Sequence, residues 1–153
     1  MQKIINSSRN KKGFTIIELL VVVAIIAVLT GIVLVNVTQY IGKSKNANIK
    51  GNMSTILTNA AVYYDDANPS TYVDFVLTAS YTNPADAADA ASGGTVTYSE
   101  IASAFCACST MNTTSSEPAG STFCVDTTGY KKVTVATCAD RCVTADVGVC
   151  TDG

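Results

Sequence analysis

The chain has 153 residues, with 10 basic and 12 acidic side chains and a formal net charge of −2. It contains no histidine, which excludes a Ser/His/Asp triad, a Cys/His nucleophile and a histidine-ligated metal. Charged residues make up 14% of the chain, against about 25% in an average soluble domain, and the apolar residues gather near its start. We therefore expect no enzyme, no cofactor and no metal site.

The first 37 residues are typical of a membrane segment behind a basic leader. Residues 1–13 carry four basic side chains and no acidic one, and residues 14–37 contain a single charged side chain, Glu18. As a helix, residues 14–37 would span about 36 Å, enough for a hydrocarbon core of about 30 Å. A basic flank stays on the cytoplasmic side. The pattern predicts a single pass through the inner (cytoplasmic) membrane, with the chain after residue 37 outside the cytoplasm.

Two ordinary types of export segment fit less well. A secretory signal peptide has an apolar core of about 7–15 residues and a small-x-small cleavage site, and this core is too long. A plain signal anchor explains the length and the basic flank, but it does not explain Glu18. A carboxylate inside an apolar span is costly and usually has a partner there.

The residues GFTIIELLVVVAIIAV resemble the type IV prepilin signature. The shared features are a short basic leader that ends in Gly13, then Phe14, then Glu18 at a fixed offset within a long apolar helix. Resemblance to the type IV pilin and pseudopilin family implies that a prepilin peptidase cuts between Gly13 and Phe14 and methylates the new amine. It also implies that the helix holds the subunit in membrane lipid and later bundles with identical subunits in a filament, with the help of a pilus assembly machinery.

Glu18 has a specific role under this hypothesis. Cleavage creates a cation at the Phe14 amine, and a lone carboxylate and a lone ammonium are both costly in an apolar bundle. Pairing Glu18 with the Phe14 amine of a neighbouring copy would set the axial register, a role well attested for buried polar pairs. The alternative is that Glu18 reaches the lipid headgroups. Removal of the leader leaves six basic and twelve acidic side chains, so we expect no general binding of nucleic acid.

The helix is predicted to continue beyond the membrane as an amphipathic segment over residues 38–66. Pro69 and the residue before it disfavour further helix. The alternative is two helices with a break near Gly42. The predicted apolar stripe is Val37, Tyr40, Ile41, Ile49, Met53, Ile56, Leu57, Ala60, Ala61 and Tyr64. The predicted opposite, polar face is Lys43, Lys45, Asn46, Asn52 and Asn59. Many family members have a helix-curving proline where this chain has Val35.

Residues 67–153 are predicted to form an exported head with a small antiparallel sheet. Strands are expected at 95–98, 122–126 and 132–136, the last two forming a hairpin through a glycine-containing turn. Residues 109–121 read as a loop. Asn83 as cap and Pro84 in the first turn could start a short helix, with a flexible loop as the alternative. The fold class is therefore α+β, with a long N-terminal helix packed against this sheet.

Six cysteines lie late in the chain, which favours a disulfide-stapled C-terminal region in an exported head. They are Cys106, Cys108, Cys124, Cys138, Cys142 and Cys150. Six cysteines allow 15 pairings, and the sequence does not choose among them. We expect one of Cys106 and Cys108 to bridge the loop to Cys124, and the last three cysteines to tie down the tail. A metal site is the alternative, but the spacing is unlike that of zinc knuckles.

These features together predict a structural filament subunit that becomes part of an extracellular pilus. One alternative is a pseudopilin of a type II secretion system. The other is a monomeric membrane-anchored binding protein, which would keep its leader and would tolerate the loss of Glu18. An anchored enzyme is least consistent with the sequence, since no set of nucleophile and base is present.

Overall fold

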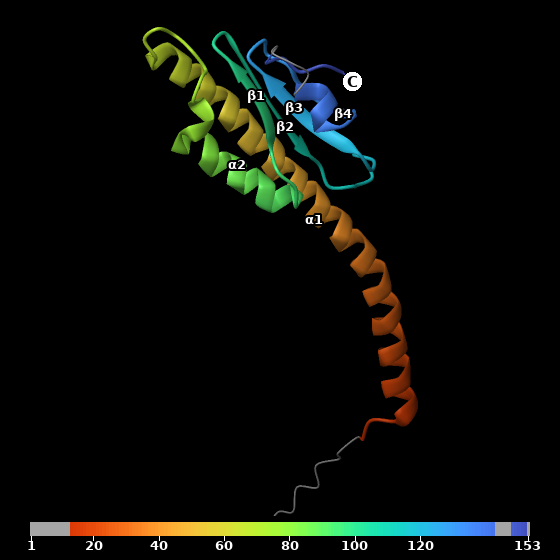
Figure 1. The fold of residues 1–153 in the computed structure, drawn as a ribbon. Coiled ribbons are helices and arrows are strands. Elements are labelled where there is room, and N and C mark those ends of the chain that lie inside the picture. The colour runs from red at the N-terminus through yellow and green to blue at the C-terminus, as the bar shows by residue number, and fades with distance from the viewer. Residues whose placement is uncertain (1–12, 143–147, 153) are drawn as a thin grey trace, which may run out of the picture. The chain divides into compact units, whose positions relative to one another are not determined.

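A computed structural model describes residues 13–142 and 148–152 of the chain. The predicted leader, apart from Gly13, lies outside the described residues. The chain divides into two compact units, Met1–Val37 and Thr38–Gly153, which we call unit 1 and unit 2. Helix α1 (Ile16–Asp66) begins in unit 1 and ends in unit 2 (Figure 1). The continuous helix is confirmed, and the alternative of a break near Gly42 is wrong.

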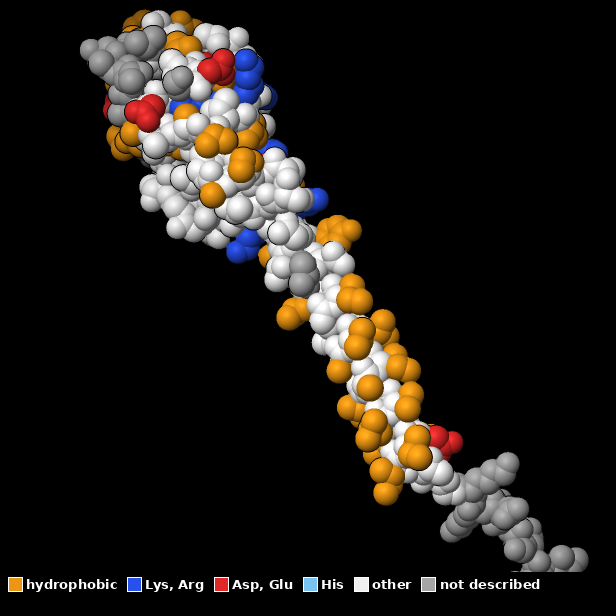
Figure 2. Space-filling view, turned by 90° about the vertical axis from the view of Figure 1, so that its right-hand side faces the viewer, with side chains coloured by type: hydrophobic (Ala, Val, Ile, Leu, Met, Phe, Trp, Pro, Cys, Tyr) orange, Lys and Arg blue, Asp and Glu red, His pale blue; other side chains and the backbone are white. Residues whose placement is uncertain are grey.

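The part of α1 in unit 1 exposes its apolar side chains on all sides. Every large apolar side chain described from Phe14 to Leu34 is exposed, by 47% to 84%. By length and composition this helix could cross a membrane. Figure 2 shows the apolar side chains projecting in every visible direction from this segment. A helix that is apolar all round requires lipid or other protein around it.

Unit 2 contains a four-stranded antiparallel sheet in the order β1-β2-β3-β4. The strands are β1 (Thr97–Ile101), β2 (Ala104–Thr110), β3 (Ser121–Asp126) and β4 (Lys131–Val135). The predicted hairpin is confirmed, with Phe123 opposite Val133 and Gly129 at φ +92° in the turn, a conformation that glycine adopts freely. The strand expected at 95–98 starts two residues later, and β2 was not predicted at all.

Strand β2 was missed because it is buried on both faces. Its alternating side chains point to opposite sides of the sheet. Phe105 and Ala107 join the hydrophobic core, whereas Cys106 and Cys108 join a separate cluster made of cysteines. A strand covered on both sides lacks the apolar–polar alternation that identifies a half-buried strand.

The short helix of the head begins earlier than predicted. A 3₁₀ turn, η1 (Phe75–Leu77), leads into α2 (Ala79–Ser92), so Pro84 lies in the second turn, and both the Asn83 cap and the alternative of a flexible loop are wrong. Proline has no N–H to donate to the carbonyl four residues back, here that of Ser80. Asn59 on α1 supplies the missing donor, with 2.6 Å between its Nδ2 and the Ser80 oxygen.

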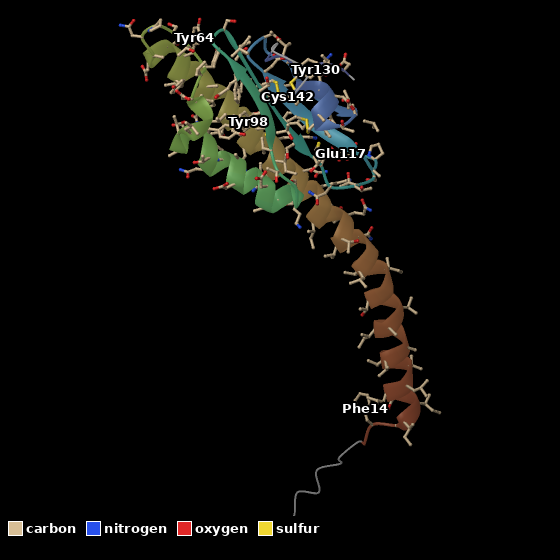
Figure 3. The ribbon with its side chains drawn as sticks, in the orientation of Figure 1. Phe14, Tyr64, Tyr98, Glu117, Tyr130 and Cys142 are labelled. Carbon is tan, nitrogen blue, oxygen red and sulfur yellow. A yellow bond between two sulfur atoms is a disulfide. The ribbon has the colours of Figure 1, made fainter. Side chains whose placement is uncertain are left out.

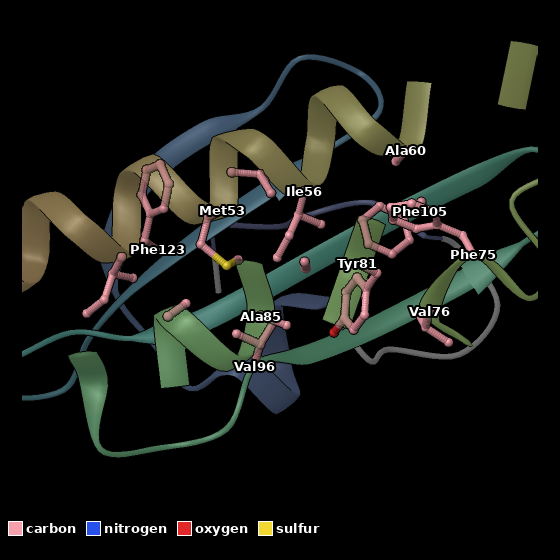
Figure 4. Packing of buried hydrophobic residues seen from close by; sticks show 14 of the residues in the cluster. Met53, Ile56, Ala60, Phe75, Val76, Tyr81, Ala85, Val96, Phe105 and Phe123 are labelled. Carbon is pink, nitrogen blue, oxygen red and sulfur yellow. The ribbon is translucent and has the colours of Figure 1, made fainter. Parts of the chain in front are cut away.

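The main core lies between α1, α2 and the sheet (Figures 1 and 4). Ile49, Met53 and Ile56 on α1 are fully buried in it. The predicted stripe is therefore correct from Ile49 onward except at Ala61, which is exposed, and it is wrong at Val37, Tyr40 and Ile41, which are exposed as well. Asn46 was placed on the solvent face, and this is wrong, because only 2% of it is exposed. The second half of α1 thus packs against the sheet, which confirms the predicted α+β fold.

Candidate assembly site

The predicted cleavage position lies just before α1. Gly13, Phe14 and Thr15 are not helical, and Phe14 is 82% exposed (Figure 3). A Cβ atom at Gly13 would meet no atom within 4 Å. Exposed, non-helical backbone is where proteases act most readily. The backbone at the predicted cleavage position is therefore non-helical and exposed.

Glu18 closes a capping box with Thr15 at the start of α1. The backbone N–H and the hydroxyl of Thr15 both donate to Glu18 Oε2, at 2.8 Å and 2.9 Å. The Glu18 N–H donates in return to Thr15 Oγ1 at 3.2 Å. This reciprocal pattern satisfies backbone donors that the first turn of a helix leaves unpaired. The Thr-x-x-Glu spacing is the sequence signature of this capping box.

The capping box occupies only one oxygen of Glu18. Both donors from Thr15 contact Oε2, and within the described part of the chain Oε1 receives no hydrogen bond. Glu18 is also the one charged side chain of residues 14–37. The carboxylate is therefore held in a defined orientation by its own helix while one acceptor stays available to another molecule.

The loop after β2 is fastened to α1 at Glu117 (Figure 3). Its carboxylate accepts hydrogen bonds from Ser116 Oγ at 2.6 Å and Thr114 Oγ1 at 2.5 Å, and it pairs with Lys50 Nζ at 2.9 Å. The hydroxyls of Ser116 and Thr114, together with the Lys50 ammonium, lower the pKa of Glu117 to about 2. Nearby, a Cβ atom on Gly42 would lie 2.9 Å from a Thr114 methyl group, so the loop approaches α1 closely there.

Three disulfides join the sheet to the C-terminal tail. They are Cys106–Cys142, Cys108–Cys138 and Cys124–Cys150. The stapled C-terminal region is confirmed, and the six sulfurs retain no thiolate for a metal. The expected bridge from Cys106 or Cys108 to Cys124 is wrong. Cys108 and Cys124 lie opposite each other on one face of β2 and β3, but the tail crosses this face and bonds to both.

Arg141 organises this tail from inside it. The residue lies on α3 (Cys138–Cys142) and is fully buried. Its guanidinium donates to the carbonyls of Thr122 and Thr151, both at 3.0 Å, and to the Tyr130 hydroxyl at 2.8 Å. Arginine suits this position because its planar group carries five donors. Figure 3 shows Tyr130 and Cys142 in this region, and nothing in the sequence marked Arg141 as buried.

Comparison with known proteins matches the N-terminal segment alone. Residues 8–34 match the family model described as the prokaryotic N-terminal methylation motif. No curated protein and no solved structure matches the chain. The match supports a type IV pilin-like class III signal peptide and, with it, a pilin-like or pseudopilin-like protein. Such a motif implies a structural protein rather than an enzyme, and together with the apolar helix it fits anchoring in a membrane.

Proposed function

We propose that the chain is a structural subunit of a type IV pilus-like filament, assembled through its N-terminal helix after cleavage between Gly13 and Phe14. The observation that carries the proposal is the methylation motif over residues 8–34, in a segment where every large apolar side chain described from Phe14 to Leu34 is exposed and Glu18 is the one carboxylate. An exposed apolar surface of this kind requires lipid before assembly and neighbouring helices after it.

The proposed maturation changes the charge at the helix start. Hydrolysis of the Gly13–Phe14 amide leaves a carboxylate on Gly13 and an amine on Phe14, and methylation of this amine keeps it cationic. In a bundle of apolar helices the amine of one copy pairs with Glu18 of the next, through the oxygen that the capping box leaves open. The pair offsets the cost of burying each charge alone and fixes the axial register.

Each segment of the chain has its own part in this proposal. Residues 1–13 form the leader that the prepilin peptidase removes, and residues 14–37 form the membrane and assembly helix. Residues 38–66 carry the helix into the head, and residues 67–153 complete the head outside the cytoplasm. The subunit waits in the inner membrane, and the pilus assembly machinery then adds it to an extracellular filament of identical copies.

The test uses the full chain, expressed in cells that supply a prepilin peptidase and an assembly machinery. Mass spectrometry of sheared filaments is expected to find N-methylated Phe14 as the first residue. Glu18→Ala is expected to be cleaved normally but to yield no filaments. Thr15→Ala is the matched control, because it breaks the same capping box and keeps the carboxylate.

Three results would contradict the proposal. If the chain isolated from these cells still carries its leader, the proposed cleavage does not occur, and a monomeric membrane-anchored binding protein is favoured. A normal yield of filaments from Glu18→Ala would show that Glu18 does not set the axial register. Equal loss of filaments in Thr15→Ala and Glu18→Ala would assign the effect to the helix cap instead.

The methylation motif fits a type II secretion pseudopilin equally well, and that alternative predicts scarce subunits in sheared material.

A further inference from the structure

The part of α1 in unit 2 carries unpaired charges of opposite sign at its two ends. Lys43 and Lys45 lie near its beginning, Asp65 and Asp66 lie at its end, and all four are exposed. The ion pairs found among the described residues are Lys50–Glu117 and Lys132–Asp152, so neither pair of end charges is neutralised within the chain. In Figure 2, the basic side chains at the lower end of the head have no acidic side chain beside them on the visible face.

Many other charged groups of unit 2 are used by the fold itself, although the side chains of Asp74, Asp86 and Lys131 also form no hydrogen bond or ion pair among the described residues. Those with hydrogen bonds or ion pairs to neighbouring residues are Lys50, Asp89, Glu100, Glu117, Asp126, Lys132, Asp140, Arg141 and Asp152. The charges at the two ends of α1 form no ion pair among the described residues. Their complementary signs suit a contact between two different patches of the same kind of molecule.

Lys43 and Asp65 lie on one side of the helix and far apart along it, whereas Lys45 lies on the opposite side, about 160° round the axis from Lys43. Lys43 and Asp65 are 22 residues apart, which corresponds to about 33 Å along the axis and to a rotation of about 40° beyond six full turns. No side chain spans that distance, so the two groups of one copy never meet. A second copy with a parallel helix, displaced by the same 33 Å or so, would bring its Lys43 beside Asp65 of the first copy.

We propose that Lys43 of one copy contacts Asp65 of another copy in the filament. The inference rests on the proposed function, which supplies parallel helices in a fixed register. The Glu18 pair joins copies offset by only the four residues between Phe14 and Glu18, far less than the 22 residues between Lys43 and Asp65. The charged contact therefore joins copies several steps further along the filament. It connects head to head, whereas Glu18 connects helix to helix.

The surface between the two charged ends allows close approach. The exposed side of α1 there includes the small side chains Ser44, Ala47, Gly51, Thr55 and Thr58, and it also carries Val62, which is 55% exposed. A Cβ atom on Gly51 would meet no atom within 4 Å. A neighbouring copy can therefore approach α1 closely at these small residues, between Lys43 and Asp65.

The first experiment treats native filaments with a carbodiimide, which couples an amine to a carboxylate only when they touch. The coupling forms an amide, and the reagent takes up the water that is lost. Mass spectrometry is expected to find Lys43 linked to Asp65 in filaments, and to find no such link in detergent-solubilised monomer. Such a link must join two copies, because the groups of one copy are about 33 Å apart on one helix.

The second experiment exchanges the charges in the full chain. Lys43→Asp is expected to lower the yield of sheared filaments about fivefold, since it sets like charges against each other. Adding Asp65→Lys to the same chain is expected to restore the yield. Lys131→Asp, at an exposed and unpaired lysine on β4, is the matched control and is expected to leave the yield unchanged. Immunoblots of the membrane-held subunit check that every variant accumulates equally.

The outcomes separate this inference from the proposed function. Filaments that form without the link, or a charge exchange that fails to restore the yield, overturn the inference and leave the proposed function intact. Wild-type chain that keeps its leader and forms no filaments overturns both. A link in filaments together with restored yield supports the head-to-head contact.

Discussion

The side-chain amide of Asn46 pairs with the backbone of Asn112 as one peptide group pairs with another. The Asn112 N–H donates to Asn46 Oδ1 at 2.8 Å, and Asn46 Nδ2 donates to the Asn112 carbonyl at 2.8 Å. The Asn112 side chain also donates to the carbonyl of Ala91 at 3.0 Å. One buried asparagine on α1 thus holds the loop after β2, and this loop holds the end of α2.

Replacing Asn46 is expected to destabilise the head. Asn46→Ala removes both partners of the Asn112 backbone at a buried position, which costs about 2–3 kcal/mol of unfolding free energy. Asn48→Ala, at an exposed asparagine two residues away, is the control and should change stability by less than about 0.5 kcal/mol. Denaturant unfolding of the detergent-solubilised chain measures both. Equal stability of the two variants would contradict the role of the pairing.

Glu117 is expected to make the head sensitive to acid. Its pKa falls from 4.5 to about 2 in the folded chain, so its stabilising effect is complete above pH 4.5 and disappears as the pH falls through about 2. Glu117→Gln should cost about 1.5–3 kcal/mol at neutral pH, as expected for hydrogen bonds to a charged group. Unfolding measured between pH 7 and 2 should show wild type and variant converging at low pH.

Glu100 offers a contrast of opposite sign. Burial raises the pKa of Glu100, against the opposing effect of its hydrogen bonds from the Val76 and Asp74 N–H groups. The folded chain therefore binds this proton more readily than the unfolded chain. The stability of wild type relative to Glu100→Gln should rise as the pH falls through the range in which Glu100 takes up its proton.

For Glu117, a difference in stability between wild type and Glu117→Gln that stays constant over the whole pH range would contradict the prediction.

The hydrogen bond from Asn59 to the Ser80 carbonyl is expected to matter because residue 84 is proline. Asn59→Ala should cost about 0.5–1 kcal/mol in the wild-type background. In Pro84→Ala, the new N–H of residue 84 can donate to the same carbonyl, so the added cost of Asn59→Ala should fall towards zero. A double-mutant cycle on unfolding free energies measures the coupling. Additive effects would show that the two residues act independently.

Arg141 is expected to hold the tail in place between its disulfides. Arg141→Lys keeps the charge but cannot reach the carbonyls of Thr122 and Thr151 together, so it should cost about 2 kcal/mol or more. Amide exchange should speed up at Thr151, whose N–H donates to the Arg141 carbonyl, and stay unchanged at Met53 in α1. Lys131→Arg, on the surface, is the control. Unchanged exchange at Thr151 would contradict the role of Arg141.

Local patterns were enough to predict the long helix and the β3–β4 hairpin. The apolar run of residues 14–37 and the spacing of Ile49, Met53 and Ile56 are helical signals that need no distant partner. Gly129 between two alternating strands marks a hairpin in the same way. The predicted site residues Gly13, Phe14 and Glu18 came from one contiguous motif, which the methylation-motif match covers.

Features that join distant parts of the chain could only come from the tertiary structure. Strand β2 is invisible as a pattern because its cysteine face is covered by the tail, and Asn46 reads as polar surface until a loop 66 residues away pairs with it. The disulfide partners depend on the path of that tail across the sheet. A local pattern predicts which side of a helix or strand is buried. Which segment packs against that side depends on how distant parts of the chain fit together.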